Sequence, residues 1–175
     1  MRVKKITELH RISIEEFKVV DKIPLIVILD NVRSLNNIGS VFRTSDAFLV
    51  ESIYLCGITA TPPNTEIHKT ALGAEDSVNW QYYNDTKNAI IELKQKGYTI
   101  CATEQAESSI MLQDLILDKK KKYAIILGNE VKGVSQEVVD LCDNCIEIPQ
   151  FGTKHSLNVS VAGGIAIWEF FRQLR

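Results

Sequence analysis

Five polar side chains in this sequence could together bind or activate a ligand: Asn37, Arg43, Glu130, Ser156 and Asn158. They supply amide, hydroxyl and carboxylate groups and one guanidinium, a set suited to orienting a polar ligand through hydrogen bonds. No pair of carboxylates, metal-ligand cluster or serine–histidine–aspartate arrangement stands out in the sequence. Four of the five also have an ordinary structural explanation: Asn37 and Asn158 as helix caps, Ser156 as a turn residue and Glu130 as a surface charge.

Three of these residues lie in or just after two turns. The apolar runs Tyr123–Leu127 and Ile146–Pro149 are typical of buried strands, and each ends in a turn of glycine and polar residues. The first turn, Gly128–Gly133, precedes a helical pattern opened by Ser135, and the second, Gln150–His155, leads into the last helix. Ligands of open α/β sheets bind where strands end and helices begin, so the sequence predicts a site at these two turns.

The first turn is not a known phosphate-binding motif. Gly128–Val134 has Lys132 before Gly133 and Val134 after it, which differs from the G-K-[ST] ending of a P-loop. No G-x-G-x-x-G follows any predicted strand either. We therefore expect a pocket formed largely by backbone donors and acceptors.

Arg43 lies on a predicted helix that follows the strand Pro24–Leu29 and begins near Asn36 or Asn37. The apolar stripe of this helix consists of Ile38, Val41, Phe42, Ser45 and Leu49. Arg43 points away from that stripe, either as a surface arginine paired with Asp46 or as a functional group. Gly39 favours the second interpretation, because a mid-helix glycine costs about 1 kcal/mol relative to alanine and implies that something needs the space.

The rest of the chain alternates strands and helices. Further strands are predicted at Ser52–Cys56, Val78–Tyr83 and Tyr98–Thr103, with a loop at Gly57–Lys69 and a helix from Asp85 to Lys96 ended by Gly97. This alternation predicts an α/β fold with a mostly parallel sheet and helices on both faces. We expect a single domain over residues 1–175 with a short helical extension at about 1–20, in which Ser13 caps a helix over Ile14–Val19.

The net charge of the chain limits how it could bind nucleic acid. The formal net charge of −2 gives no general attraction to nucleic acid, so any basic surface must be local. Lys119–Lys122 is either a solvated loop or a phosphate contact.

Without an apolar run of about 18 residues or a signal-peptide segment at the start, we expect no membrane partner and a cytoplasmic location. Cys142 and Cys145 have metal-ligand spacing but no second pair, so we predict structural cysteines and no metal.

The last helix, Asn158–Leu174, is apolar around more than one face. Such a helix is buried either in the core or against another subunit. Gly163 and Gly164 within it also imply a close approach. For a chain of this length we expect a homodimer contact.

Three segments resemble the motifs of the SpoU/TrmH family of RNA 2′-O-ribose methyltransferases, part of the SPOUT superfamily. The first motif is matched by Asn31–Ala47, the second by Ile126–Val134, and the third by Ile148–Pro149, Gly152 and Ser156–Ala162. Their order and spacing over about 135 residues make the resemblance specific. It implies a deep C-terminal trefoil knot, an exception to the rule that protein chains are not knotted.

The resemblance also implies S-adenosylmethionine as cofactor and a ribose 2′-hydroxyl of structured RNA as substrate, with tRNA slightly favoured over rRNA. The implied cofactor-binding residues are Thr103, Leu127, Gly128, Asn129, Gly133, Ile148, Pro149 and Leu157, helped by Glu130. The residue that Arg43 matches is regarded in this family as activating the hydroxyl. A neutral arginine is a poor base, so we favour Arg43 as a clamp on the ribose and a neighbouring phosphate, completed by Asn37, Glu130, Ser156 and Asn158. The alternative is a non-catalytic RNA-binding or regulatory module that kept the fold.

Overall fold

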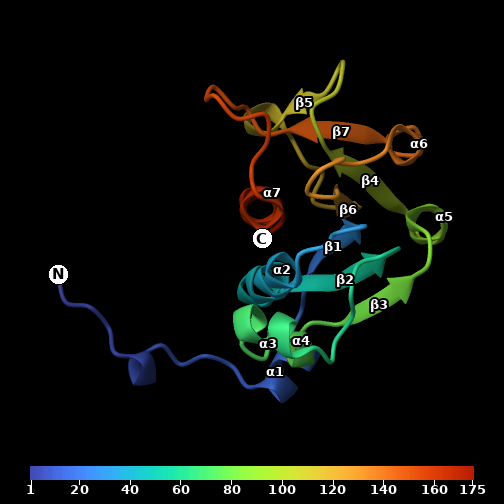
Figure 1. Cartoon of the computed structure of the whole chain (residues 1–175). Helices are drawn as coiled ribbons and strands as arrows, with labels where there is room; N and C mark the ends of the chain where they lie inside the picture. The colour runs from blue at the N-terminus through green and yellow to red at the C-terminus, as the bar shows by residue number, and fades with distance from the viewer.

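A single parallel sheet forms the centre of the fold (Figure 1). The structure is a computed structural model that describes residues 1–175, apart from the side chain of Ile6. Its elements, in chain order, are η1 (Ile6–Glu8), α1 (Ile14–Val19), β1 (Ile23–Asp30), α2 (Leu35–Ala47), β2 (Val50–Cys56), α3 (Thr65–Ala71), α4 (Ala74–Ser77), β3 (Trp80–Tyr83), α5 (Thr86–Gln95), β4 (Tyr98–Thr103), β5 (Ile110–Met111), η2 (Leu112–Asp114), β6 (Lys122–Leu127), α6 (Gln136–Val139), β7 (Asn144–Glu147) and α7 (Val159–Leu174).

The strand order is β3-β2-β1-β6-β4-β7-β5, and all neighbouring strands are parallel. The fold class is therefore α/β, and the sheet is fully rather than mostly parallel. The central pair is β1 and β6, where Leu25 lies opposite Tyr123 and Leu29 opposite Leu127. Both strands are buried on both faces, which explains why they are continuous apolar runs in the sequence.

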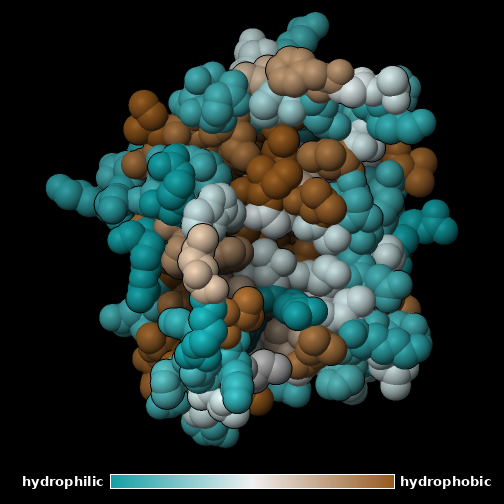
Figure 2. All heavy atoms as spheres, turned by 90° about the vertical axis from the view of Figure 1, so that its left-hand side faces the viewer, coloured by the Kyte–Doolittle hydropathy of each residue, from teal (hydrophilic) through white to brown (hydrophobic). Residues whose placement is uncertain are grey.

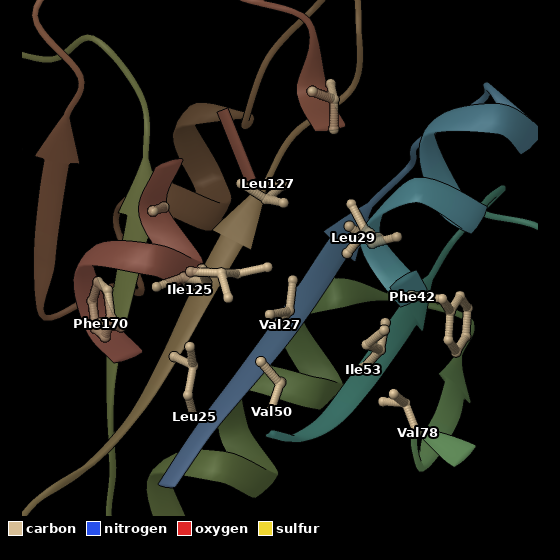
Figure 3. Packing of buried hydrophobic residues seen from close by; sticks show 14 of the residues in the cluster. Leu25, Val27, Leu29, Phe42, Val50, Ile53, Val78, Ile125, Leu127 and Phe170 are labelled. Carbon is tan, nitrogen blue, oxygen red and sulfur yellow. The ribbon is translucent and has the colours of Figure 1, made fainter. Parts of the chain in front are cut away.

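Helices cover both faces, as predicted. Alternate residues of β1 separate into two cores: Leu25, Val27 and Leu29 face one side, and Ile26 and Ile28 face the other. Figure 3 shows the first of these cores, which α2 and α7 cover. The second core is covered by α5 and α6.

The helix boundaries confirm most of the predicted caps. Ser13 caps α1 in a capping box with Glu16, and Asp85 caps α5. The start of α2 differs from the expectation at Asn36 or Asn37, because the Ser34 side chain caps this helix by accepting from the Asn37 N–H. The predicted loop Gly57–Lys69 is also partly wrong, since α3 begins at Thr65 with Asn64 as its cap.

None of the helices that the structure describes is both long enough and apolar enough to cross a membrane.

Candidate functional site

A cavity of about 320 Å³ lies at the carboxyl ends of β4, β6 and β7, where the two predicted turns meet. The end of β4 contributes Thr103 and the end of β6 contributes Leu127. The lining consists of Thr103, Glu104, Gln105, Leu127, Gly128, Asn129, Glu130, Val131, Lys132, Gly133, Val134, Glu147, Ile148, Gln150, His155, Ser156, Leu157, Val159 and Ala162. The cavity therefore lies at the strand ends where the sequence predicts a site.

The turn after β6 is a closed loop held by its own backbone. The Asn129 N–H donates to the Gly133 carbonyl at 3.1 Å, and the Gly133 N–H donates back to the Asn129 carbonyl at 2.9 Å. Gly133 has a φ of +65°, a conformation that favours glycine. A Cβ on Gly128 would lie 2.3 Å from the Gly133 carbonyl carbon, so the loop can close only with glycine at position 128.

Glu104 is a site residue that sequence reasoning did not select. Its Oε2 accepts from the Val134 N–H at 3.0 Å, and its Oε1 accepts from the Gln105 N–H at 2.9 Å. The carboxylate lies against the loop, since a Cβ on Gly133 would meet Glu104 Oε2 at 2.2 Å. The available signal was its position, the first residue after β4.

Thr103 belongs to the cavity lining through its position at the end of β4. Its Oγ1 is buried and, among the residues the structure describes, has no hydrogen-bond partner. An unpaired buried hydroxyl costs about 1–3 kcal/mol, and this one belongs to a residue that lines the cavity. The backbone-rich lining fits the predicted cofactor.

Glu130 connects the cavity loop to the start of α2. Its carboxylate accepts from the Arg33 and Ser34 backbone N–H groups, both at 2.9 Å, and from the Asn37 side-chain amide at 3.1 Å. Asn129 adds a fourth link by donating from Nδ2 to the Asn31 carbonyl at 2.7 Å. Burial alone would raise the pKa of Glu130, but these hydrogen bonds outweigh it, so its pKa is lowered from the ordinary value of 4.5. Asn37 and Glu130 thus hold the helix that carries Arg43.

We expect Glu130→Gln to lower the free energy of unfolding by about 1–2 kcal/mol at pH 7, because one backbone hydrogen bond is lost and the other is no longer charge-assisted. A carboxyl whose pKa is lowered by folding stabilises the protein above its unfolded pKa, and this contribution disappears as pH falls through the folded pKa. Urea unfolding should therefore show a difference between parent and variant at pH 7 that shrinks below about pH 4. If parent and variant differed in stability by the same amount at pH 7 and below about pH 4, the electrostatic role of Glu130 would be contradicted.

Arg43 is exposed on α2, as predicted, and it does not line the cavity. Two of the arguments around it were wrong. A Cβ on Gly39 would meet Thr70 Oγ1 at 2.1 Å and the Ile67 carbonyl at 2.3 Å, so the glycine makes room for α3 and not for a ligand of Arg43. Asp46 accepts a hydrogen bond from the Ser77 hydroxyl and so serves to hold α4.

The cavity brings together most of the predicted cofactor residues. Those that line it are Thr103, Leu127, Gly128, Asn129, Gly133, Ile148 and Leu157, together with Glu130 and Ser156. Pro149, Asn37, Arg43 and Asn158 lie outside the lining. Asn158 caps α7 by accepting from the Ser160 N–H at 2.9 Å, the structural alternative considered for it.

The residues that line the cavity without having been predicted are Glu104, Gln105, Val131, Lys132, Val134, Glu147, Gln150, His155, Val159 and Ala162. Most are neighbours in the chain of predicted residues, on the turns after β4, β6 and β7.

The cysteines are structural in this arrangement. Cys142 Sγ donates to the Val138 carbonyl and Cys145 Sγ to the Glu104 carbonyl, at 3.2 and 3.3 Å. Burial raises the pKa of Cys142 to about 12, so its thiol stays protonated at neutral pH. Within the described part of the chain, no group of three or more His, Cys, Asp or Glu side chains is placed to hold a metal ion.

Comparison with known proteins shows which family the sequence matches. The sequence profile of the SpoU rRNA Methylase family matches residues 24–168. A tRNA (guanosine(18)-2′-O)-methyltransferase of Aquifex aeolicus is 35% identical over 152 residues, which cover 85% of this chain and 69% of that protein. A TrmH family tRNA/rRNA methyltransferase of Staphylococcus saprophyticus is 33% identical, and the match spans 61% of its length.

Solved structures agree with this result. The A. aeolicus TrmH/SpoU tRNA modifying enzyme superposes with a TM-score of 0.80 at 31% identity, covering 91% of this chain and 80% of that one. An AdoMet-bound rRNA methyltransferase from Sinorhizobium meliloti superposes with a TM-score of 0.81 at 28% identity, covering 91% of this chain and 60% of that one.

Proposed function

Because this chain belongs to the SpoU rRNA Methylase family, we propose that it transfers a methyl group from S-adenosylmethionine to a ribose 2′-hydroxyl of structured RNA. The observation that carries the proposal is the cavity at the ends of β4, β6 and β7, with its backbone-rich lining. Relatives named as RNA 2′-O-methyltransferases, and one solved with AdoMet bound, support it.

The cavity residues would hold the cofactor mainly through backbone. The loop closed by Asn129 and Gly133 presents its backbone to the cavity, and Leu127, Ile148 and Leu157 supply apolar surface. When bound, S-adenosylmethionine supplies the methyl group from a sulfonium. Pro149 and Asn158 would then support the site from outside the cavity lining, through the turn after β7 and the cap of α7.

Arg43 would act on the RNA side of the reaction. Its guanidinium is always charged and has no free electron pair to take a proton, so it would orient the ribose and a neighbouring phosphate and stabilise the developing alkoxide. Asn37 and Glu130 would contribute by fixing the N-terminus of α2. Ser156 lines the cavity and would complete the polar network of the site.

We favour tRNA over rRNA as the substrate class. The chain covers 80% of the structure named as a tRNA modifying enzyme, but only 60% of the one named as an rRNA methyltransferase. The proposed substrate places the protein in the cytoplasm. We further propose that residues 1–175 act as one methyltransferase domain with the segment 1–20 as an extension.

The strand order supports a C-terminal trefoil knot. The chain leaves β4, reaches β5 beyond β7, and returns along the α7 side of the sheet through Leu112 and Leu117 to β6. After β6 it crosses to the opposite face at α6, places β7 between β4 and β5, and emerges at α7 on the first face. The C-terminal segment would thereby thread the β4–β6 connection. An experimental structure with an unthreaded backbone path would contradict the knot.

We also propose a homodimer formed through α7. Val161, Ile165 and Trp168 of α7 are 39–50% exposed at helical spacing, and Figure 2 shows hydrophobic side chains gathered on the side of the molecule where α7 and α2 lie. Packing this stripe against a second copy would bury it. Arg43 lies outside the cavity of its own chain, which fits a site completed near the subunit boundary.

Light scattering at micromolar concentration should give the mass of a dimer. Ile165→Asp, which buries a charge in the proposed interface, should give a monomer, because an unpaired buried charge is strongly unfavourable. Ile91→Asp is a matched control, since Ile91 is 50% exposed on α5, which covers the other face of the sheet. A monomeric parent protein would contradict the homodimer.

The competing function is a non-catalytic RNA-binding or regulatory module. Calorimetric titration with S-adenosylmethionine separates the two: saturable binding is expected for the methyltransferase, and an absence of binding would favour the module.

A further inference from the structure

Phe151 is an unusual surface residue. It is 97% exposed, whereas the other large aromatic side chains on the surface, Tyr82 and Trp168, are each 50% exposed. A phenylalanine held fully in water gains nothing from hydrophobic burial. Single exposed apolar residues are common, so the case for a role depends on where this one lies.

The loop that carries Phe151 has both of its ends in the cavity lining. Gln150 precedes Phe151 and lines the cavity, and His155 and Ser156 line it at the other end of the loop. Gln105 fixes that end by donating from Nε2 to the His155 carbonyl at 2.7 Å. A Cβ on Gly152 would meet no atom within 4 Å, so the tip stands clear of the protein. Phe151 therefore lies exposed to solvent on a loop whose two ends line the cavity.

Two lysines on the loops at the cavity suit contact with a polyanion. Lys154 and His155 lie exposed on the same loop, and Lys132 lies exposed on the loop across the cavity. The protein as a whole has a formal net charge of −2, so the two lysines form a local feature. An aromatic ring beside lysines is the combination with which proteins bind single-stranded RNA, by base stacking and phosphate contact.

We propose that Phe151 is a base-stacking platform for an unpaired nucleotide of the substrate RNA beside the methylated ribose, with Lys154 and Lys132 contacting the phosphates. This inference rests on the proposed function and adds a residue that selects substrates with an unstacked base at the target. A second copy of the chain is less suited than RNA to contact Phe151. The apolar stripe proposed for dimerisation lies on α7, whereas Phe151 is surrounded by glycine, threonine, lysine and histidine.

The test compares Phe151→Ala and Phe151→Tyr with the control Ile116→Ala. Ile116 is 90% exposed but precedes β6, at the end of the strand away from the cavity. Unfractionated tRNA serves as the probe, in methyl-transfer kinetics and in fluorescence-anisotropy binding without cofactor. Loss of one stacked base should raise KM and the RNA Kd of Phe151→Ala about 5- to 150-fold, with kcat and cofactor affinity near the parent values. Phe151→Tyr should restore both constants, and Ile116→Ala should change neither.

Unchanged RNA binding and KM in Phe151→Ala would overturn the inference. So would a drop in mass by light scattering, which would assign Phe151 to the subunit interface. Because the binding assay needs no methyl transfer, it tests the role of Phe151 independently of the proposed function. A parent protein that binds tRNA in a Phe151-dependent manner but transfers no methyl group would support the platform and refute the methyltransferase.

Discussion

Arg43→Ala should lower the turnover of RNA methylation by about 10²–10³-fold and leave S-adenosylmethionine binding close to that of the parent protein. Removing one preorganised contact to a developing oxyanion typically has this effect on rate. The side chain is exposed on α2 and contributes nothing to the cavity lining, so its loss opens no hole in the core and touches no cofactor contact. Folding should therefore survive.

The measurement pairs a methyl-transfer assay with a calorimetric titration of the cofactor. Arg43→Lys is the informative companion, because it keeps the charge but loses the planar, bidentate geometry of the guanidinium, and it should restore only part of the rate. If Arg43→Ala lost cofactor affinity in proportion to activity, the assignment of Arg43 to the RNA side of the site would be wrong.

The second large effect is expected for Gly128→Ala. The added methyl carbon would lie 2.3 Å from the Gly133 carbonyl carbon and 2.4 Å from the Val134 nitrogen, both of them backbone atoms that cannot move without opening the loop. Forcing a methyl group into a filled space typically costs about 1–3 kcal/mol. Because the same loop lines the cavity, cofactor affinity should fall about tenfold or more, by the usual 1.4 kcal/mol per decade.

Gly152→Ala provides the matched control for this prediction. It adds the same methyl group to the other turn at the cavity, where no atom lies within 4 Å. Calorimetry should show a near-parental affinity for this variant. Equal affinity losses in the two variants would mean that the loop closed by Asn129 and Gly133 is not what binds the cofactor.

Much of the fold could be predicted because its signals are local. Tyr98–Thr103 agrees with β4 at both ends, and Asp85 and Gly97 bound α5 because capping and left-handed termination depend on single residue types. The helix α3 was missed because Pro62 and Pro63 precede it and because it is only seven residues long after its Asn64 cap. The insertion of β6 between β1 and β4 could not be predicted from periodicity, since an apolar run carries no information about its neighbours in the sheet.

The site shows the same division between local and tertiary information. Strand ends located the cavity, because the carboxyl ends of parallel strands share one edge of the sheet. The space around Gly39 was misinterpreted because a helix pattern cannot identify the neighbour that a missing side chain admits, which here is α3. Glu130 could be selected from its motif, but its bonds to Arg33 and Ser34 join residues about a hundred positions apart, so only the structure reveals that it supports α2.

The central claim, methyl transfer to a ribose 2′-hydroxyl, is tested most directly by mapping ribose methylation in total RNA from a strain lacking the gene, then adding the purified protein and labelled S-adenosylmethionine. The account predicts one ribose methylation missing from a structured RNA, with tRNA the first expectation, and its restoration as a labelled 2′-O-methylnucleoside by the parent protein but not by Arg43→Ala. Unchanged ribose methylation in every RNA, despite expression of the protein in the parent strain, would contradict it.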